Sequence, residues 1–256
     1  MSFLKIQDIH HTYFSNQTAA TALADISLDI EKGEFVSFLG PSGCGKTTLL
    51  SIIAGLFPPT SGKILLENKP LKANSDLSIG YMLQQDYLFP WKTIEENILL
   101  GLKLIKKDEG LEKIKTLKLL SDVGLGDTGK LYPRELSGGM RQRAALARTL
   151  AVDPKILLLD EPFSALDYQT KLKLEDLVFE TLKSFGKTAV LVTHDIGEAI
   201  AMSDRIFLFS ANPGSVHKTF KVPDELRELT PFHARNHPQY PMLFQTIWKE
   251  LESLEY

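Results

Sequence analysis

Cysteine is nearly absent from this sequence, which has one, Cys44, among 256 residues. A single cysteine cannot form an internal disulfide, and this excludes the disulfide frameworks on which many secreted proteins depend. Long apolar runs are also missing, because no stretch reaches the roughly 18 apolar residues of a membrane-spanning helix. The segment MSFLKIQDIHHTYF has no apolar core of signal-peptide length. We therefore expect a cytoplasmic chain that another chain anchors if it works at a membrane.

The sequence also lacks an excess of positive charge. Its 29 Lys and Arg residues and 32 Asp and Glu residues give a net charge of −3 at pH 7. This balance excludes a basic field over the whole chain, so we expect no nucleic-acid partner. Hydrophobic residues make up 43% of the chain and charged residues 24%, which is ordinary for a globular protein. The length fits one large α/β domain or two closely associated subdomains.

Apolar strands alternate with helices over much of the chain. Strands are predicted in FLKIQDIHHTYF, ALADISLDI and Phe35–Leu39, and again in KILLLDEP, TAVLVTH and RIFLFS. Between these two groups helical patterns dominate, first over Ile94–Ile105 and then in LEKIKTLKLLSDVGL. This alternation predicts a largely parallel sheet. We predict a single domain made of a core over 1–85 and 150–210, an inserted helical subdomain over 86–149, and a C-terminal extension over 211–256.

The extension contains one clear helical pattern, LFQTIWKELESL. Its apolar residues gather near one face of a helix, and these are Leu243, Phe244, Ile247, Trp248, Leu251 and Leu254. We expect this face to pack on the chain's own domain. Binding of a partner is the alternative.

The segment GPSGCGKT follows a buried strand, opens a helix, and matches the pattern G-x-x-x-x-G-K-[ST] in full. Glycines let successive backbone N–H groups turn inward, and the helix N-terminus adds positive potential, which predicts a phosphate cradle. Lys46 would add a charge at the β- and γ-phosphates, and the Thr47 hydroxyl would bind Mg²⁺. Cys44 has no evident base nearby, which argues against a nucleophile. The predicted cradle residues are Gly40, Pro41, Ser42, Gly43, Cys44, Gly45, Lys46 and Thr47.

Two carboxylates follow the apolar run ILLL. Asp160 and Glu161 would lie at the C-terminal edge of a parallel sheet, where ligands of open α/β sheets bind. Asp160 is the natural partner of the phosphate loop in holding Mg²⁺, and Glu161 could polarise a water. An acid that caps a helix is the alternative. His194 ends the next apolar strand and reaches the same edge, and Asp195 is predicted to cap the helix IGEAIAM.

The stretch LSGGMRQRAALARTL places two glycines at the start of a predicted helix. Glycine disfavours a helix by about 1 kcal/mol relative to alanine, so this pair has another use. Ser137 is a good N-cap, and the helix dipole adds positive potential at the same end. Because Gly138 and Gly139 have no side chains, backbone N–H groups here are open to a close approach by a phosphate.

Over roughly 3–210, the order and spacing of the motifs resemble those of the ATP-binding subunit of an ABC transporter. These motifs are GPSGCGKT, LSGGM, ILLLDEP, SALD and VTHD. The resemblance implies an α/β fold with a phosphate-loop, RecA-like ATPase core, an antiparallel β subdomain and an inserted α-helical subdomain. It also implies a head-to-tail dimer, in which each ATP lies between the phosphate loop of one copy and LSGGM of the other. Met140 stands where glutamine is usual, although many importer subunits share it.

Further site residues follow from the resemblance alone. Gln84 matches the glutamine that touches Mg²⁺ and the attacking water, with Gln85 as the alternative. Tyr13 matches the aromatic residue that stacks on adenine, with Phe14 as the alternative. The implied catalytic residues are Glu161, as base or water-positioner, with His194, Gln84 and Lys46. The implied Mg²⁺ ligands are Thr47, Gln84 and Asp160. The implied ATP contacts outside the cradle are Tyr13, Thr48, Ser137, Gly138, Gly139 and Asp167.

The branch of the family is indicated by two segments. LFPW and the tail RELTPFHARNHPQYPMLFQTIWKEL are similar to importer subunits for nitrate, sulfonate and taurine. This implies an ATPase at the cytoplasmic face of the cell membrane, with transmembrane permease subunits and, indirectly, an extracytoplasmic solute-binding protein. YLFPW would line the groove for a permease helix, with a local core patch as the alternative. An exporter subunit, or a soluble ABC-type ATPase unconnected with transport, is the alternative function.

Overall fold

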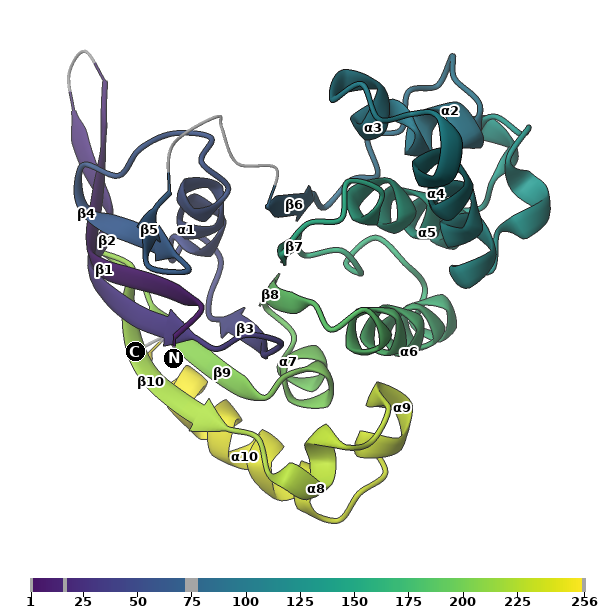
Figure 1. The fold of residues 1–256 in the computed structure, drawn as a ribbon. Helices are drawn as coiled ribbons and strands as arrows, with labels where there is room; N and C mark the ends of the chain where they lie inside the picture. Colours follow the sequence, from purple (N-terminus) through teal and green to yellow (C-terminus); the bar gives the residue numbers. More distant parts are fainter. Residues whose placement is uncertain (1, 16–17, 72–77, 255–256) are drawn as a thin grey trace. The chain divides into compact units, whose positions relative to one another are not determined.

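The computed structural model describes residues 2–15, 18–71 and 78–254. The chain divides into two compact units, which we call the first unit, Met1–Asp76 with Thr188–Tyr256, and the second unit, Leu77–Lys187. Figure 1 shows the strands and helices of both along the chain. The helical subdomain predicted over 86–149 falls within the second unit, which also contains two strands and a long helix after them.

The first unit contains two groups of strands. An antiparallel sheet has the order β2-β1-β4-β5, formed by β1 (Leu4–Phe14), β2 (Ala19–Ile30), β4 (Ser61–Leu66) and β5 (Lys69–Pro70). The other group has the order β10-β9-β3-β8, formed by β3 (Phe35–Leu39), β8 (Thr188–Thr193), β9 (Arg205–Ser210) and β10 (Ser215–Lys221). β3 is parallel to both β8 and β9, which confirms the predicted parallel pairing, whereas β10 is antiparallel to β9.

The burial of these strands follows their sequences. Every residue of β3 and β8 is buried, as expected for parallel strands that are covered on both faces. β2 instead alternates buried and exposed residues over its second half, because only one face of its sheet meets the core. β10 was not predicted: its sequence SVHKTFK is mostly exposed and polar, and its pairing with β9 makes it a strand.

The helices of the first unit include the predicted C-terminal helix. They are α1 (Lys46–Ile53), α7 (Ile196–Met202), α8 (Asp224–Arg227), α9 (Pro231–Ala234) and α10 (Gln239–Glu252). α10 lies beside α7 (Figure 1), and its Ile247 is fully buried in a cluster with Ala199 and Ile200 of α7. The apolar face of α10 therefore packs on its own unit, which confirms the expectation.

The second unit combines a pair of parallel strands with helices. Its elements are β6 (Ile79–Met82), β7 (Ile156–Asp160), α2 (Ile94–Ile98), α3 (Leu100–Leu104), α4 (Gly110–Asp122), α5 (Gly138–Leu150) and α6 (Tyr168–Ser184). The single helix predicted over Ile94–Ile105 is divided at Leu99 into α2 and α3. Gly101 of α3 is closely packed, since a Cβ on this residue would lie 2.6 Å from Cγ1 of Val152. Among the described residues, no helix has the length and apolarity needed to cross a membrane.

Candidate functional site

The phosphate loop connects the fully buried β3 to α1 in the first unit. Gly45 caps α1 with φ 87°, in the left-handed region that favours glycine. A Cβ on Gly45 would lie 2.6 Å from Cδ2 of Leu23 and 2.8 Å from the carbonyl oxygen of Ala22, both on β2. Backbone conformation and close packing thus both require glycine here. Ser42, Gly43 and Thr47 are exposed, whereas Cys44 is buried, which agrees with a structural cysteine.

Lys46 lies across the loop that it follows. Its side chain is only 6% exposed, and its Nζ donates hydrogen bonds to the carbonyl oxygens of Gly40 (2.8 Å) and Pro41 (2.9 Å). The ammonium group is therefore held at the N-terminus of α1, where the helix dipole also attracts anions. Cation, helix terminus and glycine-lined loop form a site that fits a phosphate chain.

Tyr13 lies next to the helix that follows this loop. Its hydroxyl is 3.3 Å from the Thr48 hydroxyl on α1, and its ring makes an edge contact with His11, with centroids 4.6 Å apart. Burial lowers the pKa of His11, which favours the neutral imidazole, and this ring packs against the ring of Tyr13. Tyr13 is 47% exposed and Phe14 is 76% exposed. Tyr13 thus combines an accessible ring with an anchor on the phosphate-loop helix.

His194 is an exposed residue between β8 and α7 of the first unit. The neighbouring Asp195 caps α7, because its Oδ1 accepts hydrogen bonds from the N–H groups of Gly197 (2.6 Å) and Glu198 (3.1 Å). The predicted capping role of Asp195 is confirmed. His194 consequently stands at a turn whose backbone is fixed on its C-terminal side.

The acidic strand end lies in the second unit. Asp160 ends β7 in a buried position, and its Oδ2 accepts a hydrogen bond of 3.2 Å from the Tyr81 hydroxyl on β6. Glu161 follows with φ 46°, a left-handed conformation that is rare for residues other than glycine. The Ser164 hydroxyl donates to the Glu161 carbonyl oxygen (3.0 Å) and accepts from Nε2 of Gln84 (3.1 Å). The structure thus brings Gln84, Glu161 and Ser164 together.

The loop that carries Gln84 is bonded to α5. The helix was predicted from the sequence, but its contact with this loop was not. Gln142 donates to the Gln84 carbonyl oxygen (3.1 Å), and Arg141 pairs with Asp86 (3.0 Å). Arg148 donates to the carbonyl oxygens of Asp86 and Tyr87, both at 2.7 Å. A signal is present in the sequence, because Arg141 and Arg148 are seven residues apart and fall on one helical face. That spacing does not reveal what the face contacts.

The two glycines of LSGGM differ in their surroundings. Ser137 caps α5 as predicted, accepting from the Met140 N–H at 3.3 Å. A Cβ on Gly139 would lie 2.5 Å from Cγ2 of Thr170 on α6, so this glycine is required for helix packing. The nearest atom to a Cβ on Gly138 is Cδ2 of Leu166, at 3.6 Å, an ordinary contact. Internal packing therefore explains Gly139 but not Gly138.

The family of this chain follows from a comparison with known proteins. The family model described as ABC transporter matches residues 23–164, a segment that contains the phosphate loop, LSGGM and the acidic strand end. The chain belongs to the ABC transporter family. Its folds and motifs are therefore those of an ABC-type ATPase, the ATP-binding subunit of a transporter.

Relatives of this ABC ATPase cover nearly the whole chain. The ABC transporter ATP-binding protein YtlC of Bacillus subtilis is 64% identical, over 100% of this chain and 98% of the relative. A taurine import ATP-binding protein of Roseobacter denitrificans is 41% identical, over 91% of this chain and 89% of the relative. A solved dimeric ATP-binding cassette with bound ADP and phosphate aligns with a TM-score of 0.74 at 36% identity, over 86% of this chain and 99% of the other.

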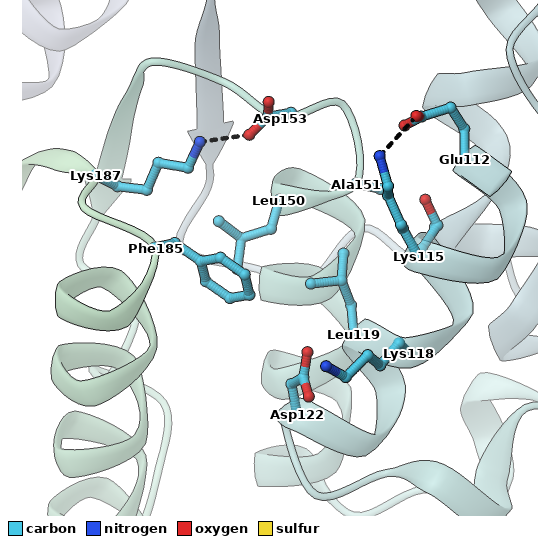
Figure 2. Close-up of a pocket in the computed structure, with 11 residues that line it drawn as sticks. Glu112, Lys115, Lys118, Leu119, Asp122, Leu150, Ala151, Asp153, Phe185 and Lys187 are labelled. Atoms are coloured by element: carbon cyan, nitrogen blue, oxygen red, sulfur yellow. Dashed lines mark hydrogen bonds and ion pairs between the residues drawn. The ribbon is translucent and has the colours of Figure 1, made fainter.

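The ABC ATPase also has a pocket of about 320 Å³ within its second unit (Figure 2). Leu119, Leu150 and Phe185 form its apolar part. Its charged residues balance, as they are Lys115, Lys118, Lys187, Glu112, Asp122 and Asp153. Two ion pairs span them, Lys187 with Asp153 at 2.5 Å and Lys115 with Glu112 at 3.0 Å. The pocket thus lacks the excess positive charge that suits a triphosphate, and it contains none of the predicted site residues.

Proposed function

We propose that this chain is the ATP-hydrolysing subunit of an importer for small organic anions of the sulfonate class. It works as a head-to-tail homodimer at the cytoplasmic face of the membrane, on separate permease subunits. The observation that carries the ATP site is the buried Lys46 folded over the glycine loop at the start of α1. The import direction and the solute class rest on two relatives, named for taurine import and aliphatic sulfonates import, at 41% and 42% identity.

The first unit would bind the nucleotide. The N–H groups of the loop from Gly40 and the Lys46 ammonium hold the phosphates, while Thr48 stays hydrogen-bonded to the Tyr13 hydroxyl. The accessible ring of Tyr13 stacks on adenine. Because Gly45 is closely packed against β2 and Lys46 is already buried, little ordering is needed when ATP binds.

The second unit would contribute the hydrolytic groups. Asp160 and Gln84, with Thr47 of the first unit, offer a carboxylate, an amide and a hydroxyl oxygen, the hard ligands that Mg²⁺ prefers. When bound, Mg²⁺ neutralises charge on the β- and γ-phosphate oxygens. Glu161 orients and deprotonates the attacking water, and His194 stabilises the charge that develops in the transition state or holds Glu161.

LSGGM would complete the site of the partner subunit. A Cβ on Gly138 would make only ordinary contacts, so packing does not require glycine here, and Ser137 caps the positive dipole end of α5 at the same point. A γ-phosphate contacted by Lys46 of one copy and by Ser137 and Gly138 of the other joins the two copies. Hydrolysis removes this bridge, so the closed and open dimers differ in stability. Asp167, which caps α6 in the same unit, would contact the same nucleotide.

Tyr87 and Trp91 would form the contact with the permease. They are 59% and 70% exposed, and Arg148 fixes the backbone of this segment by bonding the Tyr87 carbonyl oxygen. Large exposed aromatic residues on a fixed loop are typical anchors of protein interfaces. An extracytoplasmic solute-binding protein would deliver the solute to the permease.

Glu161→Gln tests the hydrolytic assignment. The variant should bind ATP and form a stable dimer by size-exclusion chromatography, with hydrolysis at least about 100-fold slower, as expected when a general base is lost. Near-normal turnover would exclude Glu161 as the base. Uptake of labelled taurine in cells that lack this chain, complemented with wild type or Glu161→Gln, tests import. Solute retention that rises without the chain would indicate an exporter.

A further inference from the structure

The residues on both sides of His194 are joined by one buried hydroxyl group. The Thr193 hydroxyl donates to Oε2 of Glu198 (2.5 Å) and accepts from the Asp195 N–H (2.9 Å). Thr193 is 2% exposed and Glu198 is 4% exposed, so water does not compete for these bonds. The end of β8 and the first turn of α7 are therefore one rigid piece, with His194 between them.

The first turn of α7 is in turn packed by the C-terminal extension. A Cβ on Gly197 would lie 2.8 Å from the Tyr240 hydroxyl of α10 and 3.0 Å from Oδ1 of Asp195. The tyrosine hydroxyl and the capping carboxylate thus approach the same point of the helix. α7 also shares a buried cluster with the extension, in which Ile196 packs with Leu226 and Ile247.

We propose that the C-terminal extension positions His194 through α7, with Thr193, Glu198 and Tyr240 as positioning residues. The inference rests on the proposed role of His194 in hydrolysis. A displacement of α10 at Gly197 moves the capped turn, and the Thr193 hydroxyl transmits that movement to the backbone of His194. The extension therefore sets the rate of hydrolysis without touching the nucleotide.

Thr193→Val removes the two hydrogen bonds of the Thr193 hydroxyl with a side chain of nearly the same shape. Loss of one buried hydrogen-bonded hydroxyl should lower kcat for ATP about tenfold, and KM should stay unchanged because the phosphate loop is not altered. Thr193→Ser keeps the hydroxyl and should restore most of the rate. A purely structural role would lower the thermal midpoint without changing kcat per folded molecule, so both quantities are measured.

Tyr240→Ala tests the extension, and Met242→Ala, 71% exposed on the same helix, is its matched control. Tyr240→Ala should lower kcat at unchanged KM, and Met242→Ala should match wild type. Wild-type kcat in either Thr193→Val or Tyr240→Ala overturns the inference. His194→Ala is measured alongside: if it hydrolyses normally, the proposed role of His194 fails first, whereas an inactive His194→Ala beside active positioning variants refutes only the inference.

Discussion

Replacing Gly139 with alanine should destabilise the second unit, although alanine is the better helix former. The added Cβ would lie 2.5 Å from Cγ2 of Thr170, whereas two carbon atoms in contact prefer about 3.5–4.0 Å. Relief of this overlap requires α5 and α6 to separate by about 1 Å or Thr170 to change rotamer. Overpacking of this kind costs about 1–3 kcal/mol, and the helix preference of alanine returns at most about 1 kcal/mol.

With a mid-range overpacking cost of about 2 kcal/mol and a return of about 1 kcal/mol, we expect a net loss of about 1 kcal/mol in the free energy of unfolding. In a chain of this size each kcal/mol lowers the melting temperature by about 2–4 °C, so the midpoint should fall by about 2–4 °C. Circular dichroism during thermal and urea unfolding measures both quantities. Gly138→Ala is the matched control, because its nearest neighbour at 3.6 Å leaves room for the methyl group. This control should unfold like wild type yet hydrolyse ATP more slowly.

Thr170→Ser provides the rescue. It removes Cγ2 but leaves the backbone N–H of residue 170, which donates to Oδ1 of Asp167 at 3.1 Å, in place. The double variant Gly139→Ala/Thr170→Ser should recover most of the lost stability. If Gly139→Ala is as stable as Gly138→Ala, or if the serine brings no recovery, the packing explanation of Gly139 is refuted.

Two other substitutions test the remaining assignments. Lys46→Ala removes a buried ammonium group whose charge-assisted hydrogen bonds are worth about 1.5–3 kcal/mol. ATP should therefore bind roughly 10–100-fold more weakly in a fluorescent-nucleotide titration. An unchanged affinity would contradict the predicted phosphate cradle. Hydrogen bonds from the backbone and side chain of Thr93 lower the pKa of Glu96. The ionised Glu96 carboxylate therefore stabilises the folded chain fully at neutral pH, and this stabilisation is lost as the pH falls through the lowered pKa. Glu96→Gln keeps an uncharged capping box and should show a smaller loss of stability below about pH 4, measured by urea unfolding across pH; equal losses in both proteins would count against it.

Much of the fold could be predicted because its signals are local. Short apolar runs such as ILLL and VLV, bounded by polar residues, are typical of strands covered on both faces, and Ser137 and Asp195 are capping residues that act within three positions along the chain. The phosphate loop is also a local signal, since Lys46 bonds the carbonyl oxygens of Gly40 and Pro41, which are six and five residues before it. These features need no knowledge of what lies across the molecule.

The features that escaped prediction depend on distant partners. Gly138 and Gly139 are neighbours of identical type, and only Thr170 on another helix distinguishes them. Arg148 could be placed on a helical face, but its targets, the carbonyl oxygens of Asp86 and Tyr87, belong to a loop far away in the sequence. β10 is polar along most of its length and becomes a strand only through its pairing with β9.

The conformation of Glu161 depends on its own backbone and on bonds from a neighbouring residue. A glutamate with φ 46° carries backbone strain of about 1–2 kcal/mol that glycine at this position would not have. The Ser164 hydroxyl and backbone N–H both bond the Glu161 carbonyl oxygen, at 3.0 Å and 3.3 Å, so the surroundings hold the strained conformation. These two bonds fix the backbone of Glu161 directly after β7, and so fix the point from which its carboxylate extends. A fixed backbone at this position suits the role that we propose for Glu161, which is to act on the attacking water.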